Sequence, residues 1–142
     1  MKFRALTIIG GLALLTTTAV LAAPPADDHP SGDLKTIMVA LGEQMTRVQS
    51  ALWVEDLGTV SEAARQVADH PHVSPEERAR VQGALGSDFA AFVVADRAVH
   101  DAAVRLSEVA GSGDLDGTVR ELAAVQAGCV SCHSQFRERL RR

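Results

Sequence analysis

Residues 115–140 read LDGTVRELAAVQAGCVSCHSQFRERL, and the spacing of the side chains in this segment decides what fold the chain can form. The positions that recur at alternating steps of four and three residues are Leu115, Val119, Leu122, Gln126, Cys129, His133, Phe136 and Leu140. In a helix of about 3.6 residues per turn, positions with this spacing share one face. We therefore expect a helix over residues 115–140 whose inward face carries Cys129 and His133.

The same periodicity continues upstream, where no alternation typical of strands occurs. A helix is expected over residues 33–53, with its apolar face formed by Leu34, Met38, Leu41, Met45, Val48 and Leu52. A second helix is expected after residues 56–58, with Val60, Ala64 and Val67 on one face. It should end before His70-Pro71, because a residue that precedes proline disfavours the α region.

Ser74-Pro75-Glu76-Glu77 has the composition of a helix start, with serine as N-cap, proline at the first position and acids in the first turn. This segment should pause at Gly83 and Gly86. The third main helix is expected over residues 87–110, with an inward face of Phe89, Phe92, Val99 and Leu106. Because the connections are short, neighbouring helices should be antiparallel. Each helix has a single apolar stripe, so none of them is stable on its own. We predict an all-α, up-down-up-down four-helix bundle over residues 33–142.

Cys129-Val130-Ser131-Cys132-His133 has the pattern C-x-x-C-H, which is typical of covalent attachment of c-type haem. Because the two thiols share a helix face, they can form thioethers with the two vinyl groups of one porphyrin. His133 then projects at the iron, for which neutral imidazole is a good ligand. The motif predicts one covalent haem c on the C-terminal helix of the bundle. The low content of large aromatics, four Phe, one Trp and no Tyr, leaves space that a haem would fill.

Three other interpretations of the cysteines compete with haem. A thioredoxin-type pair needs a βαβ context and a helix N-terminus, whereas this pair lies deep inside a helix. A zinc site needs two further ligands at metal spacing, and the other histidines are scattered: His29, His70, His72 and His100. A disulfide would leave His133 on the core stripe without a partner. Haem attachment is therefore the favoured interpretation.

The N-terminal segment predicts export. Lys2 and Arg4 precede a short apolar run and a small-residue stretch, which together describe a secretory signal peptide over residues 1–23. The alternative is a retained membrane anchor, which the threonines of this segment and the prolines that follow it disfavour. Residues 24–32 then form a flexible lead-in. Cleavage leaves 12 basic and 18 acidic residues, a formal net charge of −6 with histidines neutral. We expect a periplasmic protein with no membrane span after cleavage and no affinity for nucleic acid.

Over residues 34–142 the chain resembles the class II c-type cytochromes, the cytochrome c-prime group. The resemblance rests on the C-terminal position of the motif, the Cys-His-x-x-Phe-Arg run ending at Arg137, and the Met-x-x-Leu-Gly run that begins at Met38. It implies that Met38 is the distal ligand, as in low-spin members; high-spin members carry an aliphatic residue there. The family often has a basic residue four positions earlier, where this chain has Leu34 next to Lys35. Relatives are often dimers, so a homodimer is a possible state.

The sixth ligand decides between two functions. Met38 and Met45 both lie on the inward stripe, both could be core filler, and helix rise does not choose between them. The resemblance favours Met38. A haem with both axial positions filled passes electrons to redox partner proteins, and His/Met ligation raises its potential. The alternative is an open, high-spin iron that binds nitric oxide or carbon monoxide. A thiol-disulfide enzyme is a third hypothesis. The sequence has no arrangement for hydrolytic catalysis, and we predict a non-enzyme.

Several other residues carry expectations of their own. Arg137 is the best candidate to pair with a haem propionate. The arginines at the C-terminal end could compensate the helix dipole or dock an acidic partner. His100 is expected at the boundary of the third helix's apolar stripe, and Trp53 as a packing anchor at the end of the first helix.

Overall fold

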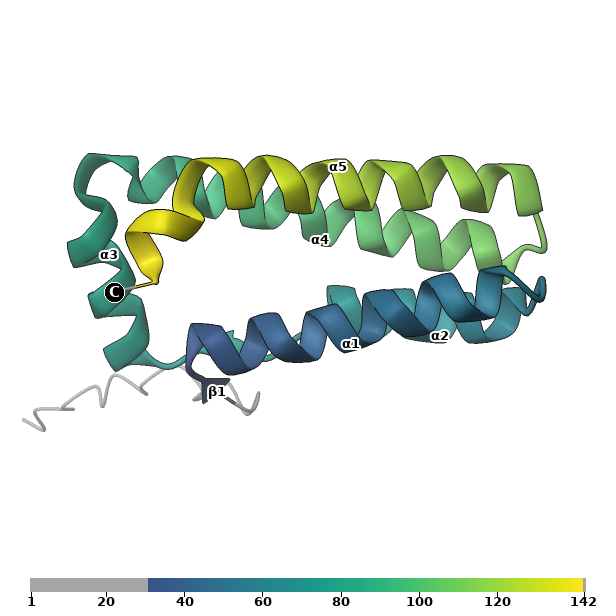
Figure 1. Cartoon of the computed structure of the whole chain (residues 1–142), viewed down its shortest axis with the longest axis horizontal. Coiled ribbons are helices and arrows are strands. Elements are labelled where there is room, and N and C mark those ends of the chain that lie inside the picture. The colour runs from purple at the N-terminus through teal and green to yellow at the C-terminus, as the bar shows by residue number, and fades with distance from the viewer. Residues whose placement is uncertain (1–30, 142) are drawn as a thin grey trace, which may run out of the picture.

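The computed structural model describes residues 31–141 of the chain, so the predicted signal peptide and most of the lead-in lie outside the described residues. The helices are α1 (Leu34–Leu52), α2 (Leu57–Ala68), α3 (Pro75–Leu85), α4 (Phe89–Gly111) and α5 (Leu115–Leu140). A 3-10 turn at Gly86–Asp88 joins α3 to α4. The four long helices run up, down, up and down (Figure 1), so the predicted architecture is confirmed. None of the described helices is long and apolar enough to cross a membrane.

Side-chain caps set where the helices begin. Asp33, Asp56, Ser74 and Asp114 each accept a hydrogen bond from the backbone N–H three residues further on, at the starts of α1, α2, α3 and α5. Such caps satisfy N–H groups that have no partner inside the helix. The predicted pause at Gly83 does not occur, because α3 continues through it and ends at Leu85, with Gly86 as its C-cap. Gly86 has φ of 54°, a left-handed value that glycine adopts without strain.

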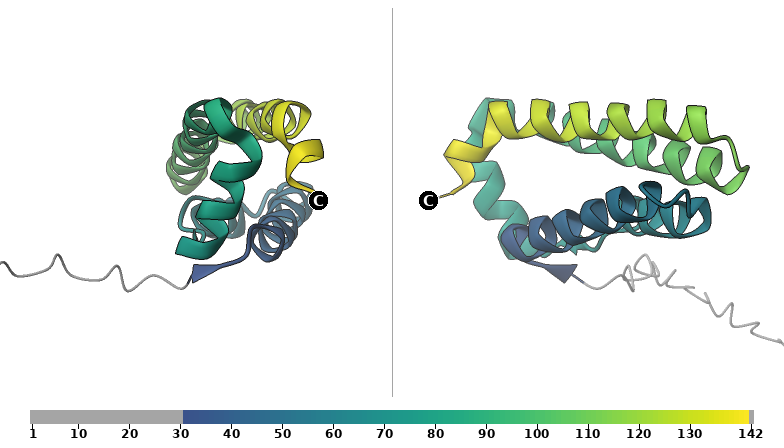
Figure 2. Two further views of the ribbon diagram at one scale, coloured as in Figure 1. Left: turned by 90° about the vertical axis from the view of Figure 1, so that its left-hand side faces the viewer. Right: turned by 45° about the vertical axis from the view of Figure 1, so that its right-hand side comes forward.

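The main core lies where α2 packs against α1 and α4, and α4 against α5. Its fully buried members include Val48, Val60, Ala64 and Leu106. A second, smaller cluster brings together Val81 and Leu85 of α3 and Phe136 of α5. This second cluster lies at the end of the bundle that α3 crosses (Figure 2).

A two-stranded parallel pairing ties the start of α1 to the segment before α3. Strand β1 (Ser31–Gly32) pairs with β2 (His72–Val73). The sequence did not predict it, because two residues are too short to show alternation. The last two residues of the predicted flexible lead-in are therefore in a strand. The pairing fixes the first turn of α1 beside the first turn of α3.

Three positions expected on inward faces are solvent-exposed, namely Val119 and His133 of α5, and Trp53. Val119 is 50% exposed, and the buried residues of this part of α5 are Thr118, Leu122 and Val125. A strict four-three repeat averages 3.5 residues per turn, so it drifts by ~20° per heptad on a straight helix. Trp53 is 86% exposed and is not a packing anchor. Because α1 ends at Leu52 and the backbone N–H of Asp56 bonds back to Ala51, the turn directs Trp53 away from the bundle.

Candidate haem site

The C-x-x-C-H motif lies in the C-terminal half of α5, next to both hydrophobic clusters. Cys129 packs against the main core and Cys132 against the cluster of Val81, Leu85 and Phe136. Gly128 lets α5 approach α4 closely at this level, since a Cβ there would lie 3.0 Å from Cγ2 of Val99. The motif therefore starts where the two helices touch and continues toward the end that α3 crosses.

A cavity of about 590 Å³ opens beside the motif. Its walls come from α1, α3, α4 and α5, and its apolar lining consists of Leu34, Met38, Phe92, Cys132, Phe136 and Leu140. Phe92 meets Phe136 edge to face, with ring centroids 5.6 Å apart. His133 is exposed on α5 and lines the same cavity. The cavity is the space expected for a large flat apolar cofactor.

The two inward methionines of α1 have different surroundings. Met38 is half-buried and lines the cavity together with Cys132 and His133. Met45 packs two turns further along α1 against the main hydrophobic core. The structure therefore resolves what helix rise left open, namely which methionine shares a space with His133. The role of Met38 as an iron ligand stays a prediction.

The two thiols are not activated for redox catalysis. Both cysteines are free. Burial raises the pKa of the Cys129 thiol, and burial together with the nearby charge of Asp96 raises the pKa of the Cys132 thiol. A raised pKa keeps the thiol protonated, whereas a thioredoxin-type nucleophile needs a lowered one. The direction of both pKa shifts therefore argues against a thioredoxin-type pair.

The zinc alternative finds no support in the part of the chain that the structure describes. Within residues 31–141, no group of three or more His, Cys, Asp or Glu side chains is placed to hold a metal ion. His100 is half-buried at the edge of the apolar face of α4, as expected, and its Nδ1 is 2.9 Å from the backbone oxygen of Ala68. His70 and His72 line a second cavity of about 500 Å³, next to the first. His133 is therefore the histidine that lines the cavity beside the cysteines.

The rim of the main cavity is positively charged. Basic side chains from three helices line it together with two acids: Lys35, Arg80, Arg137, Arg141, Asp33 and Glu77. Four basic and two acidic groups give a formal charge of +2 on these walls. Both acids already accept hydrogen bonds, Asp33 from Thr36 and Glu77 from Arg80. A cationic rim over an apolar floor fits a haem, whose macrocycle is apolar and whose two propionates are anionic.

The arginines of the C-terminal end differ from one another. Arg137 lines the cavity, as its predicted role requires. Arg139 instead reaches the end of α3, where it donates hydrogen bonds to the backbone oxygens of Ala84 and Leu85 and pairs with Asp88 at 2.5 Å. Arg139 therefore has a structural role, since it caps another helix, and its role in docking a partner stays a prediction.

Sequence reasoning missed the contribution of α3 to the site. Glu77 and Arg80 line the cavity, although the sequence indicated only that this segment starts a helix. The available signal was the spacing of Glu77 and Arg80, which allows an ion pair on one helix face. Nothing in that spacing indicates which other helix the pair faces.

Comparison with known proteins gives two results. Residues 35–137 match the protein family described as Cytochrome C′. The cytochrome c′ of Rhodospirillum rubrum is 32% identical over 147 aligned residues, which cover 92% of this chain and 95% of the relative. No solved structure gave a significant match.

Proposed function

Because the chain belongs to the cytochrome c′ family and carries one covalent haem c, we propose that it is a periplasmic electron carrier with His133 and Met38 as axial ligands. The observation that carries this proposal is the cavity between α1 and α5, which Met38 and His133 line from the two helices. When bound, the haem supplies one-electron chemistry between ferric and ferrous iron. A thioether ligand favours the ferrous form and raises the potential.

The residues of the chain have distinct tasks in this proposal. Cys129 and Cys132 anchor the macrocycle, while His133 holds the iron from the same helix. Met38 occupies the position that a dissolved gas would otherwise take. Phe92 and Phe136 exclude water from the haem face, which keeps the local dielectric low.

The basic rim supports a role for Arg137 toward a propionate. Arg137 lines the cavity from the same helix as His133, one turn further on. Its planar guanidinium is suited to a carboxylate because two parallel N–H donors can bond the two oxygens.

We expect no enzymatic activity, because neither axial position would be open to a substrate. The acidic chain is expected to exchange electrons with redox partner proteins, as a monomer or a homodimer.

An absorption spectrum of the purified holoprotein tests the proposed function. His/Met ligation predicts a low-spin spectrum in both oxidation states that carbon monoxide leaves nearly unchanged. A high-spin ferrous spectrum that converts fully with carbon monoxide would show that the sixth position is open, which contradicts the electron-carrier proposal.

One observation favours the second candidate function, a binder of nitric oxide or carbon monoxide. The second cavity shares Leu34, Met38 and Phe92 with the first, so Met38 borders space on two sides. A side chain with room on both sides can move away from the iron at a low packing cost. The carbon monoxide titration distinguishes the two candidates directly.

A further inference from the structure

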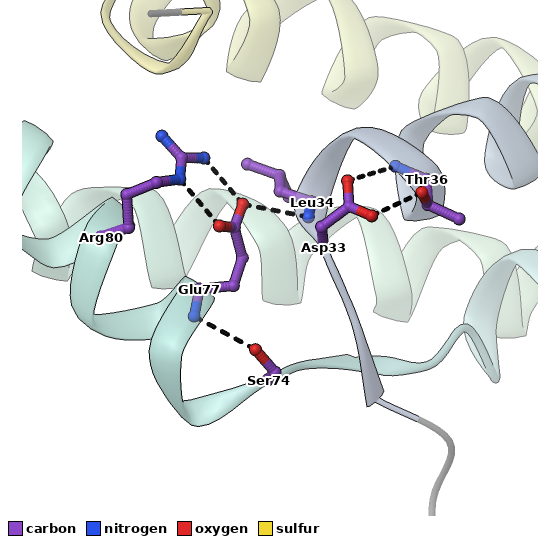
Figure 3. Close-up of polar contacts among 6 residues, drawn as sticks. All are labelled: Asp33, Leu34, Thr36, Ser74, Glu77 and Arg80. Carbon is purple, nitrogen blue, oxygen red and sulfur yellow. Dashed lines mark hydrogen bonds and ion pairs between the residues drawn. The ribbon is translucent and has the colours of Figure 1, made fainter.

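Glu77 of α3 joins two helices at the rim of the haem cavity. One of its carboxylate oxygens, Oε1, accepts a hydrogen bond from the backbone N–H of Leu34 at 3.1 Å. Arg80 donates from Nη2 to the same oxygen and from Nε to Oε2, both at 2.7 Å. Figure 3 shows these contacts between the first turn of α1 and the first turns of α3. The side chain of Glu77 is only 12% exposed, so this carboxylate is part of the wall.

This use of Glu77 differs from ordinary capping. A glutamate three positions after an N-cap serine often bonds back to the backbone N–H of that serine. Here the N–H of Ser74 bonds instead to the backbone oxygen of Gly32 at 3.0 Å. Glu77 is thereby free to satisfy the Leu34 N–H, one of the donors at the start of α1 that no intrahelical acceptor can reach. The carboxylate therefore caps a helix to which it does not belong.

Arg80 is held in place with one nitrogen unused. Both of its hydrogen bonds to Glu77 use Nε and Nη2, which leaves Nη1 without a hydrogen-bond partner among residues 31–141. The side chain is 41% exposed and lines the cavity. A guanidinium already fixed by a carboxylate loses little further freedom when it binds a second one. Arg80 is the cation that α3 contributes to the wall of the cavity, whereas the neighbouring Leu34 of α1 contributes no charge.

We propose that Arg80, held by Glu77, binds a haem propionate, and that Glu77 couples this contact to the first turn of α1, where Met38 follows Leu34 by four residues. Arg80 is then a haem-binding residue, and Glu77 is a positioning residue. The link to Met38 rests on the proposed axial ligation, whereas the propionate contact does not. The proposal adds a contact from α3 to those expected from α5.

Arg80→Met in the holoprotein tests the propionate contact. The variant keeps a long side chain and removes the charge, so we expect the ferrous-to-ferric ratio at a fixed applied potential to fall by roughly threefold, because a nearby cation stabilises the reduced, less positive haem. The propionate bending bands in the resonance Raman spectrum should shift as well. Arg80→Lys should have a reduction potential close to that of the unmodified protein, because lysine keeps the positive charge.

A matched control removes an arginine of similar exposure from another surface ion pair. Arg105 pairs with Glu121 at 3.2 Å between α4 and α5 and does not line the cavity. Arg105→Met should change neither the potential nor the propionate bands. If folded Arg80→Met, checked by circular dichroism, also leaves both unchanged, the propionate contact is refuted. The bands do not depend on the sixth ligand, so this failure is distinct from failure of the proposed function.

Glu77→Gln tests the coupling to α1. The amide oxygen can still accept from the Leu34 N–H, but the charge that orients Arg80 is lost. We expect the propionate bands to shift toward those of Arg80→Met, with little added binding of carbon monoxide. Glu77→Ala loses both contacts and should raise the carbon monoxide-accessible fraction of the iron several-fold. Equal accessibility in Glu77→Ala and the unmodified protein would refute the positioning role of Glu77.

Discussion

At the end of the bundle that holds the two interhelical turns, alanines pack between the helices, whereas phenylalanines and α3 border a cavity at the opposite end. Ala63, Ala64 and Ala103 have no solvent exposure and surround Leu106. At the other end, Phe92 and Phe136 stand beside the cavity, and Leu85 anchors α3. Figure 1 shows α2 beside the part of α1 that leads into the interhelical turn, while α3 bridges the far end.

The difference shows how one chain makes a packed core and a cofactor cavity from the same four helices. Small side chains let helix backbones approach, so that dispersion contacts close the turn end without a cofactor. Large side chains and an inserted short helix hold the opposite end apart. The turn end should therefore stand alone, and the cavity end should depend on haem for part of its packing. Four predictions test this division.

The largest effect is expected from replacing both cysteines by alanine. Cys129→Ala with Cys132→Ala should abolish covalent haem, and the cavity end should lose the packing that a bound cofactor contributes. Hydrogen exchange measures the result. Amides of α3 and of α5 beyond Gly128 should exchange much faster, while those near Leu106 should keep most of their protection.

The outcome that contradicts the division is uniform loss of protection. If the amides around Leu106 exchange as fast as those of α3, the bundle unfolds as one unit and the turn end has no independent stability. Retention of haem through denaturation in the double variant would instead refute covalent attachment through these cysteines.

The second prediction compares the two methionines, which lie in different regions. Met38→Leu should open one iron face, so the spectrum should become high-spin, carbon monoxide should bind readily, and the potential should fall. Met45→Leu should leave the spectrum nearly unchanged and cost less than about 1.5 kcal/mol of stability, because it is a volume-conserving change in a core. Absorption spectra with and without carbon monoxide measure both.

The matched pair makes the result easy to interpret. If Met45→Leu opens the iron while Met38→Leu does not, the assignment is reversed. If neither substitution changes an already low-spin spectrum, a different side chain holds the sixth position.

The third prediction concerns the turn end alone. Leu106 has no exposed surface, so Leu106→Ala should leave a cavity and lower the free energy of unfolding by about 3 kcal/mol. The haem spectrum should not change, since Leu106 does not line the cavity. Chemical denaturation of the holoprotein measures the first value. A changed haem spectrum in the folded Leu106→Ala variant would mean that the two regions are coupled more tightly than their packing indicates.

The helices and the haem motif could be predicted from the sequence because both depend on local spacing. The periodicity in residues 33–53 and the cap at Ser74 gave helix starts close to those of α1 and α3. The position of Trp53 could not be predicted, because it depends on how a four-residue turn directs one side chain. Spacing within α5 also could not show that Val119 faces solvent, because a four-three stripe drifts around a straight helix and the buried part of it depends on where α4 packs.

The parts of the site on α5, which carries the motif, and on α1, which carries Met38, could be predicted from the sequence. The part on α3 could not. Cys132, His133 and Met38 were predicted from pattern and resemblance, and they line one cavity. Glu77 and Arg80 join them only because the pairing of β1 with β2 brings the start of α3 to the start of α1. That pairing involves residues about 40 positions apart and has no local signature.

The smallest effect is expected at Arg139, which fastens α3 to α5 at the cavity end. Its hydrogen bonds to the last carbonyls of α3 and its ion pair with Asp88 are partly exposed, so Arg139→Met should lower the free energy of unfolding by only about 1 kcal/mol. The loss should be local, because α3 packs on α5 through Val81 and Leu85 and is not part of the main core. Faster hydrogen exchange confined to α3 would therefore accompany the small change in stability.

Arg97→Met is the control, since Arg97 pairs with Asp101 on the surface of α4 alone and its loss should leave α3 unaffected. Equal effects of the two substitutions on α3 would mean that Arg139 acts only through general charge. A slower electron transfer in Arg139→Met at low salt, with α3 fully protected, would instead support partner docking as the role of this arginine.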